Sequence, residues 1–212
     1  GEMIMPGNWT MSMMWMRMPG QTWPGIAASF IGMWTLMMVP MMLPSLVPVL
    51  WHYREIVGGA GSRRIGLLTT LAGAGYFFVW TLFGIAVFPL GRAMAGIEMQ
   101  QPALARGMPI AVGGVVLIAG FLQLTAWKAR HLACCRDALA RGCTSGAGAA
   151  WRYGVGLGIE CTCCCLPLMA ILLVIGVMDL RVMAVVTAAI TSERFAPAGG
   201  RVAPAIGGGV VT

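Results

Sequence analysis

Cysteine occupies four of the five positions from 161 to 165, in the stretch CTCCCLPLM that precedes a long apolar run. If this stretch is helical, Cys161, Cys165 and Met169 lie on one face because they are four residues apart. Cys164 lies beside them, three residues after Cys161. Thiolate and thioether sulfur atoms are soft ligands that select copper(I), zinc or iron–sulfur clusters. The spacing therefore predicts a soft-metal site in an apolar helix, although buried cysteines also pack as small apolar side chains.

A second sulfur-rich stretch, MWTLMMVPMMLPSLVP, spans residues 33–48. Its methionines recur at helical spacing, and the candidate ligands among them are Met37, Met38, Met41 and Met42. At a rise of about 1.5 Å per residue, Met41 would lie roughly 15 Å from Trp51, and Cys165 roughly 18 Å from Tyr153. The two stretches are therefore expected at one level of a bundle. Thioether partners favour copper(I) over zinc, which prefers Cys and His, while methionine that only fills packing gaps is the alternative.

Both stretches carry residues that are costly inside a membrane. Pro40, Pro44 and Pro48 each remove a backbone donor from the first one. A helix broken in this way must be buried in protein or line a wet cavity. Glu160 is the single charge within residues 153–178. An ionisable group at such a depth usually marks a site or a pathway, so Glu160 joins the candidate ligands.

The composition is that of a membrane protein. The chain is 58% hydrophobic and 10% charged, with a mean hydropathy of +0.82, whereas soluble domains carry about 25% charged residues. Apolar segments cover residues 26–51, 65–91, 107–127, 153–178 and 182–192. They predict an all-α, polytopic transmembrane helical bundle with about five spans. We expect an outward-facing segment 1–25, a transmembrane domain 26–205 and a tail 206–212 that starts a further span, with both chain ends incomplete.

The basic residues are unevenly distributed between the segments that join the spans. If the spans alternate, ten lie on one side: Arg54, Arg63, Arg64, Lys128, Arg130, Arg136, Arg141, Arg152, Arg194 and Arg201. Four lie on the other: Arg17, Arg92, Arg106 and Arg181. The positive-inside rule places the ten in the cytoplasm and the N-terminal segment outside. This uneven distribution predicts a bacterial inner-membrane protein with the lipid bilayer as its partner. It explains the net charge of +7 without a nucleic-acid-binding function.

Further soft ligands lie outside the expected spans. The N-terminal segment contains Met3, Met5, Met11, Met13, Met14, Met16 and Met18, which form either a collector of soft metal or an interfacial lead-in. The opposite loop, residues 128–152, contains His131, Cys134, Cys135 and Cys143. Of these, His131 and Cys135 are candidate metal ligands. The alternative for His131, as for His52, is an ordinary surface histidine.

Several of these residues together resemble a known family. They are Met33, Trp34, Met37, Met38, Met41, Met42, Pro44 and Ser45; Lys128, Leu132, Cys135 and Arg136; and Cys161, Cys164, Cys165, Leu168, Met169, Gly176, Val177, Met178, Met183, Ala184 and Glu193. In these blocks the chain is similar to the predicted metal-binding integral membrane proteins described as domain of unknown function 2182. The chain departs from that pattern at His131, where a Cys is expected, and at Cys163 and Leu166, where Gly and Trp are expected. The resemblance implies metal binding.

The leading hypothesis is a membrane protein that handles copper(I), either by transport or by delivery to a membrane enzyme or a metallochaperone partner. The alternative is a non-catalytic accessory subunit of a larger membrane complex, because Gly-rich helix faces suit helix docking. A thiol redox enzyme is a third hypothesis, which the apolar setting of the cysteines disfavours. The sequence has no phosphate-binding Gly-rich loop, nucleophile triad or HExxH motif, which favours a protein that is not an enzyme.

Overall fold

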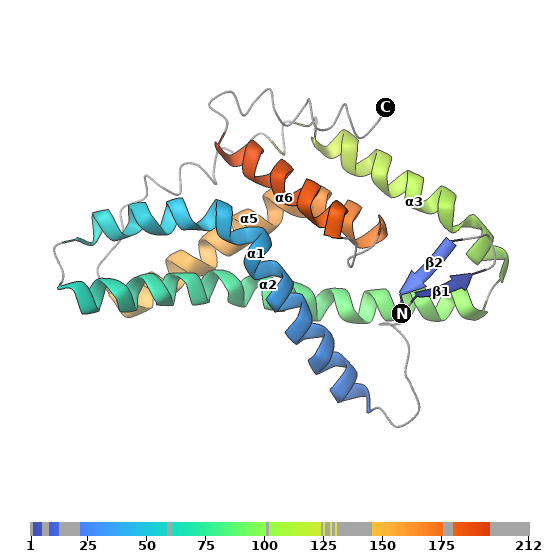
Figure 1. Cartoon of the computed structure of the whole chain (residues 1–212), viewed down its shortest axis with the longest axis horizontal. Coiled ribbons are helices and arrows are strands. Elements are labelled where there is room, and N and C mark those ends of the chain that lie inside the picture. Colours follow the sequence, from blue (N-terminus) through green and yellow to red (C-terminus); the bar gives the residue numbers. More distant parts are fainter. Residues whose placement is uncertain are drawn as a thin grey trace.

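The computed structural model describes residues 2–5, 9–12, 22–58, 61–100, 102–123, 125, 128, 130, 146–175 and 180–195. The helices are α1 (Trp23–Ile56), α2 (Ser62–Gln100), α3 (Pro102–Gln123), α5 (Ala147–Ile175) and α6 (Leu180–Phe195). Figure 1 shows them packed as one bundle, which confirms the expected all-α helical class. A short antiparallel hairpin precedes them, formed by β1 (Glu2–Met5) and β2 (Trp9–Ser12). The sequence analysis did not predict this hairpin.

Three of the helices are long and apolar enough to cross a membrane. The qualifying stretches are Trp23–Ile56, Ser62–Gly96 and Ala147–Val174, and α3 contributes a shorter apolar stretch, Ile110–Gln123. The expected segments 26–51, 65–91 and 182–192 each fall within one described helix, and α3 and α5 cover most of segments 107–127 and 153–178. The described part of the chain therefore contains three helices of spanning length, whereas the sequence predicted about five spans. Large apolar side chains such as Leu36, Ile110 and Leu180 are exposed on the bundle surface, which is compatible with contact to lipid.

The expectation that a long connecting segment separates the apolar segments 65–91 and 107–127 is wrong. Helix α2 continues to Gln100, and α3 begins at Pro102. The stretch RAMAGIEMQ, residues 92–100, contains Ala, Met and Glu, which are good helix formers, and no proline. Proline suits the first position of a helix because its missing N–H would have no partner there, so Pro102 starts α3. The charged residues of this stretch lengthen a helix instead of forming a loop.

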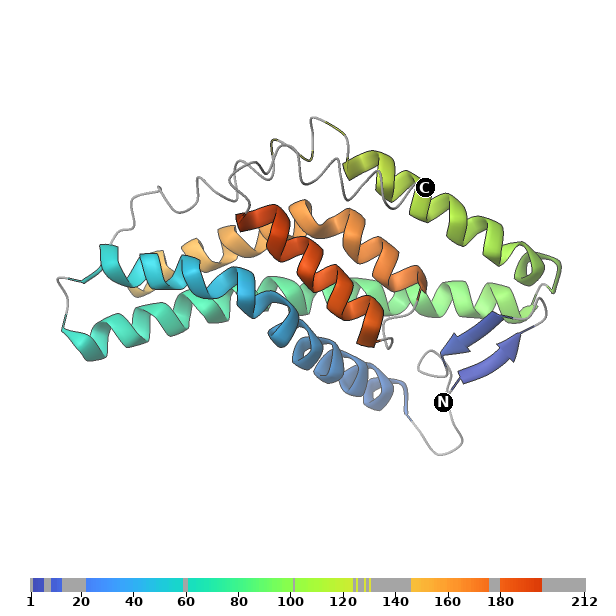
Figure 2. The same ribbon diagram turned by 45° about the horizontal axis from the view of Figure 1, so that its top comes forward.

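Helix α1 bends but stays helical through its three prolines, as Figures 1 and 2 show. Pro40, Pro44 and Pro48 are exposed, whereas Met37 and Met41 are buried. Of the two expected settings for the proline stripe, burial in protein is therefore not found in the described part of the bundle. A helix can accommodate proline by bending at the interrupted hydrogen bonds, so the prolines occupy the outer face and leave the methionine face to the bundle.

Close approach of α2 and α5 depends on glycines. A Cβ at Gly154 would collide with the carbonyl oxygen of Ala72, and a Cβ at Gly75 would lie 2.6 Å from the carbonyl oxygen of Trp151. A Cβ at Gly158 would lie 2.8 Å from Val79. Small residues let membrane helices approach closely. Gly75 on α2 and Gly154 and Gly158 on α5 thus let the two helix backbones approach closely.

We expect Gly154→Ala to lower the free energy of unfolding by about 1–3 kcal/mol, because the new methyl group forces two backbones apart. Gly156→Ala is the matched control on the same helix, since a Cβ there meets nothing within 4 Å. This control should be neutral or slightly stabilising, because alanine is the better helix former. Thermal unfolding of both variants in detergent checks the prediction, and equal midpoints would contradict the close helix contact.

Candidate metal centre

Two cysteine thiols meet on the buried face of α5. The Sγ atoms of Cys161 and Cys165 lie 3.8 Å apart on successive turns, and both side chains are inaccessible to solvent. The Tyr76 hydroxyl on α2 donates a hydrogen bond to Cys161 Sγ at 3.0 Å. Helices α2 and α5 therefore both contribute polar groups next to this thiol.

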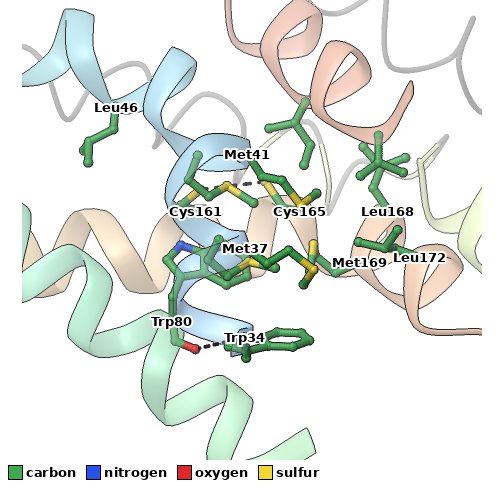
Figure 3. Close-up of a cluster of buried hydrophobic side chains, with 14 of the residues drawn as sticks. Trp34, Met37, Met41, Leu46, Trp80, Cys161, Cys165, Leu168, Met169 and Leu172 are labelled. Carbon is green, nitrogen blue, oxygen red and sulfur yellow. Dashed lines mark hydrogen bonds between the residues drawn. The ribbon is translucent and has the colours of Figure 1, made fainter. Parts of the chain in front are cut away.

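Several methionine side chains belong to the same buried cluster as the thiol pair. The buried cluster that contains Cys161 and Cys165 also contains Met37, Met38, Met41, Met42 and Met169. Figure 3 shows Met37 and Met41 reaching from α1, and Met169 from α5, toward the region of the two cysteines. We call this group of two cysteines and five methionines the sulfur cluster. The two sulfur-rich stretches of the sequence thus pack in one part of the bundle.

Aromatic side chains form one wall of the sulfur cluster. Trp34 and Trp80 are both fully buried, and the Trp34 indole donates to the Trp80 carbonyl oxygen at 3.0 Å. Gly84 makes room for the Trp34 ring, because a Cβ there would lie 2.5 Å from it. The Trp80 indole N–H finds no acceptor among the described residues. A buried donor without an acceptor is costly. This wall of the sulfur cluster therefore contains one costly group, the Trp80 N–H.

The ligand chemistry of the described residues is sulfur chemistry. Within the described ranges, no group of three or more His, Cys, Asp and Glu side chains converges as a metal site. The convergent soft groups are the two thiols and the neighbouring thioethers. Structural zinc sites use four Cys or His ligands, whereas mixed thiolate and thioether sulfur suits copper(I). The residues present therefore fit copper(I) better than zinc.

The other candidate ligands lie beside the sulfur cluster or outside the described residues. Cys164 is buried next to Cys165 on α5, and Cys163 is half-buried. Glu160 is half-buried on α5. His131, Cys134, Cys135 and Cys143 fall outside the residues that the structure describes. His52 is exposed and pairs with Glu55 at 3.3 Å, which confirms it as a surface histidine.

A buried ion pair lies next to the cysteines and was not predicted. Lys128 was assigned to the cytoplasmic loop, but its ammonium group is buried 2.8 Å from Glu193 Oε2. The Lys128 Nζ also donates to the Cys164 carbonyl oxygen. Both charged residues appear in the blocks of the family resemblance, and each closes an apolar segment of a chain with few charges. This position at the end of an apolar segment was the sequence signal for the ion pair. A basic loop residue that follows the positive-inside rule explained Lys128 equally well, so the pair was not predicted.

Comparison with known proteins gives one family. A family model for PpoB2, described as a copper chaperone, matches residues 31–212. No curated protein and no solved structure matches the chain. The match supports the copper that the cysteine and methionine ligands predicted, without confirming the family name used for the resemblance. Because it covers most of the chain, including every residue of the sulfur cluster, the chain belongs to the PpoB2 family of copper chaperones.

Proposed function

We propose that the chain is an integral membrane copper(I) chaperone that carries its cargo in the sulfur cluster. The observation that carries this proposal is the meeting of the Cys161 and Cys165 thiols, 3.8 Å apart, inside a shell of methionines. Membership of a copper chaperone family supports copper as the metal. Three apolar helices of spanning length support a location in the membrane.

The two kinds of sulfur in the cluster have different tasks. The thiols of Cys161 and Cys165 lose protons when they bind metal, so they supply the anionic and stronger ligands. The thioethers of Met37, Met41 and Met169 are neutral, and their flexible side chains can change partners with little strain. The thiolates bind copper(I) strongly, and the thioethers transfer it to the next ligands on its path. The buried setting keeps competing water away from the sulfur atoms.

The proposal extends to a route through the bilayer. The outward-facing methionines of segment 1–25 collect copper(I), and the sulfur cluster holds it at membrane depth. The inner loop then receives it at His131 and Cys135, and Cys164 and Glu160, next to the thiol pair on α5, are additional ligands. Delivery to a membrane enzyme or a metallochaperone partner completes the path. The distribution of basic residues supports a bacterial inner membrane with the N-terminal segment outside.

The double substitution Cys161→Ser/Cys165→Ser tests the thiol pair. We expect the detergent-purified protein, loaded anaerobically with copper(I), to hold near-stoichiometric copper and the double variant to lose it, because serine is a hard ligand. Cys163→Ser is the matched control from the same turn of α5, outside the cluster, and it should keep its copper. Elemental mass spectrometry provides the measurement. Absence of copper from all three proteins would contradict the proposal and favour the accessory-subunit hypothesis.

The double substitution Met37→Leu/Met41→Leu separates ligation from packing. Leucine nearly conserves the volume of methionine, so the cost in stability should stay below about 1.5 kcal/mol per site. Loss of two thioethers should nevertheless weaken copper(I) binding by about tenfold or more, equivalent to roughly 1.4 kcal/mol. Competition with a chromophoric copper(I) chelator measures this affinity. The exposed Met94→Leu serves as the control, and an unchanged affinity in the double variant would reduce the methionines to packing residues.

A further inference from the structure

The ion pair between Lys128 and Glu193 joins three separate parts of the chain. The Glu193 carboxylate on α6 accepts from Lys128 Nζ at 2.8 Å and from Gln123 Nε2, at the end of α3, at 3.1 Å. Lys128 Nζ also donates to the carbonyl oxygen of Cys164 on α5. Gln123, Lys128 and Glu193 are 2%, 0% and 1% exposed. Every contact of this network is therefore shielded from water.

Stability alone is a poor explanation for this network. Desolvating two charges is expensive, and buried ion pairs can often be replaced by apolar side chains without loss of stability. In a chain that is 58% hydrophobic, apolar packing would be the simpler solution. Ionisable residues within a membrane bundle usually serve a site. The point where this network touches α5 indicates which site that is.

Lys128 forms a hydrogen bond with α5 at the peptide group between Cys164 and Cys165. The carbonyl of Cys164 and the Cα of Cys165 belong to one planar peptide unit. Pro167 lies inside α5 and has no N–H, so it leaves the Cys163 carbonyl without its helical donor. The helix is therefore locally weakened where the cysteines lie. A charged donor on the next carbonyl fixes the orientation of the peptide unit that carries the Cys165 side chain.

We propose that Lys128 and Glu193 are positioning residues for the Cys161–Cys165 thiol pair. Glu193, held by Gln123, orients the Lys128 ammonium, and Lys128 in turn orients the peptide unit that sets the direction of Cys165 Sγ. Neither charged side chain binds the metal. This proposal rests on the proposed function in one respect, namely that the thiol pair is the site of soft-metal binding.

The test removes both charges together, so that no lone charge stays buried. In Lys128→Met/Glu193→Gln, methionine keeps the apolar stem of the lysine, and glutamine keeps an oxygen that accepts from Gln123. The matched control is His52→Met/Glu55→Gln, at an exposed pair that is 3.3 Å apart. Lys128→Arg keeps a charged donor and should rescue binding. If the first variant fails to fold in detergent, Lys128→Met/Glu193→Leu replaces it, with an apolar residue at both positions.

Two measurements are made on variants whose thermal midpoints match the wild type. The first is copper(I) affinity by chelator competition, which we expect to fall about 10- to 100-fold, the usual effect of losing a group that orients a ligand. The second uses mercury(II) on the metal-free protein, in a background whose only cysteines are Cys161 and Cys165. X-ray absorption should find two sulfur ligands on mercury in the parent, and fewer when the ion pair is absent.

The two readouts separate this inference from the proposed function. Loss of affinity and loss of the second mercury–sulfur bond in a folded variant would support positioning, because a purely stabilising pair would change neither. Retention of two sulfur ligands in that variant would overturn it. If the wild type binds no copper(I), the proposed function falls, and the mercury result alone decides whether the ion pair positions the thiols.

Discussion

Contact between the backbones of α2 and α5 determines where the sulfur atoms lie. Because Gly75, Gly154 and Gly158 have no side chain, the two helices approach until side chains on one meet the backbone of the other. Gly158 lies against Tyr76 and Val79, and one turn further along α5 the thiol of Cys161 accepts the Tyr76 hydroxyl. A wider spacing would separate these two groups. The glycine contact thus fixes the depth and direction of the cysteine face.

Helix α1 completes the sulfur cluster from the opposite side. Its prolines are exposed and its methionines are buried, so the bend turns the flexible side chains inward. The Trp34 indole fixes the register of α1 against α2 through the Trp80 carbonyl, in a space that Gly84 leaves open. Rigid aromatic packing at one edge and adaptable methionine at the other give a cluster whose position is fixed while its methionine side chains can still move.

The local sequence pattern predicted the helices, because apolar length is enough to identify them. It also predicted the shared depth of the sulfur atoms, because the rise per residue of a helix is constant. It did not predict that α2 continues to Gln100, since charged residues after an apolar run look like the start of a loop. It placed Lys128 at the membrane surface for the same reason. Pairing of Lys128 with Glu193 depends on how α6 packs against the rest of the bundle, and no local pattern carries that information. The exposed side of the proline stripe is likewise a result of tertiary packing.

Charge balance is a constraint on any metal held by the thiol pair. Copper(I) bound by two thiolates would carry a net negative charge, which an apolar interior disfavours. Lys128 would be a poor counterion, because it is already paired with Glu193 at 2.8 Å. The Tyr76 hydroxyl donates to Cys161 Sγ, and the Trp80 N–H has no acceptor among the described residues, so these two dipoles of α2 would face that charge. In the proposed function, α6 would therefore act on the thiols through the Glu193–Lys128 pair, while α2 would supply the dipoles that offset their charge.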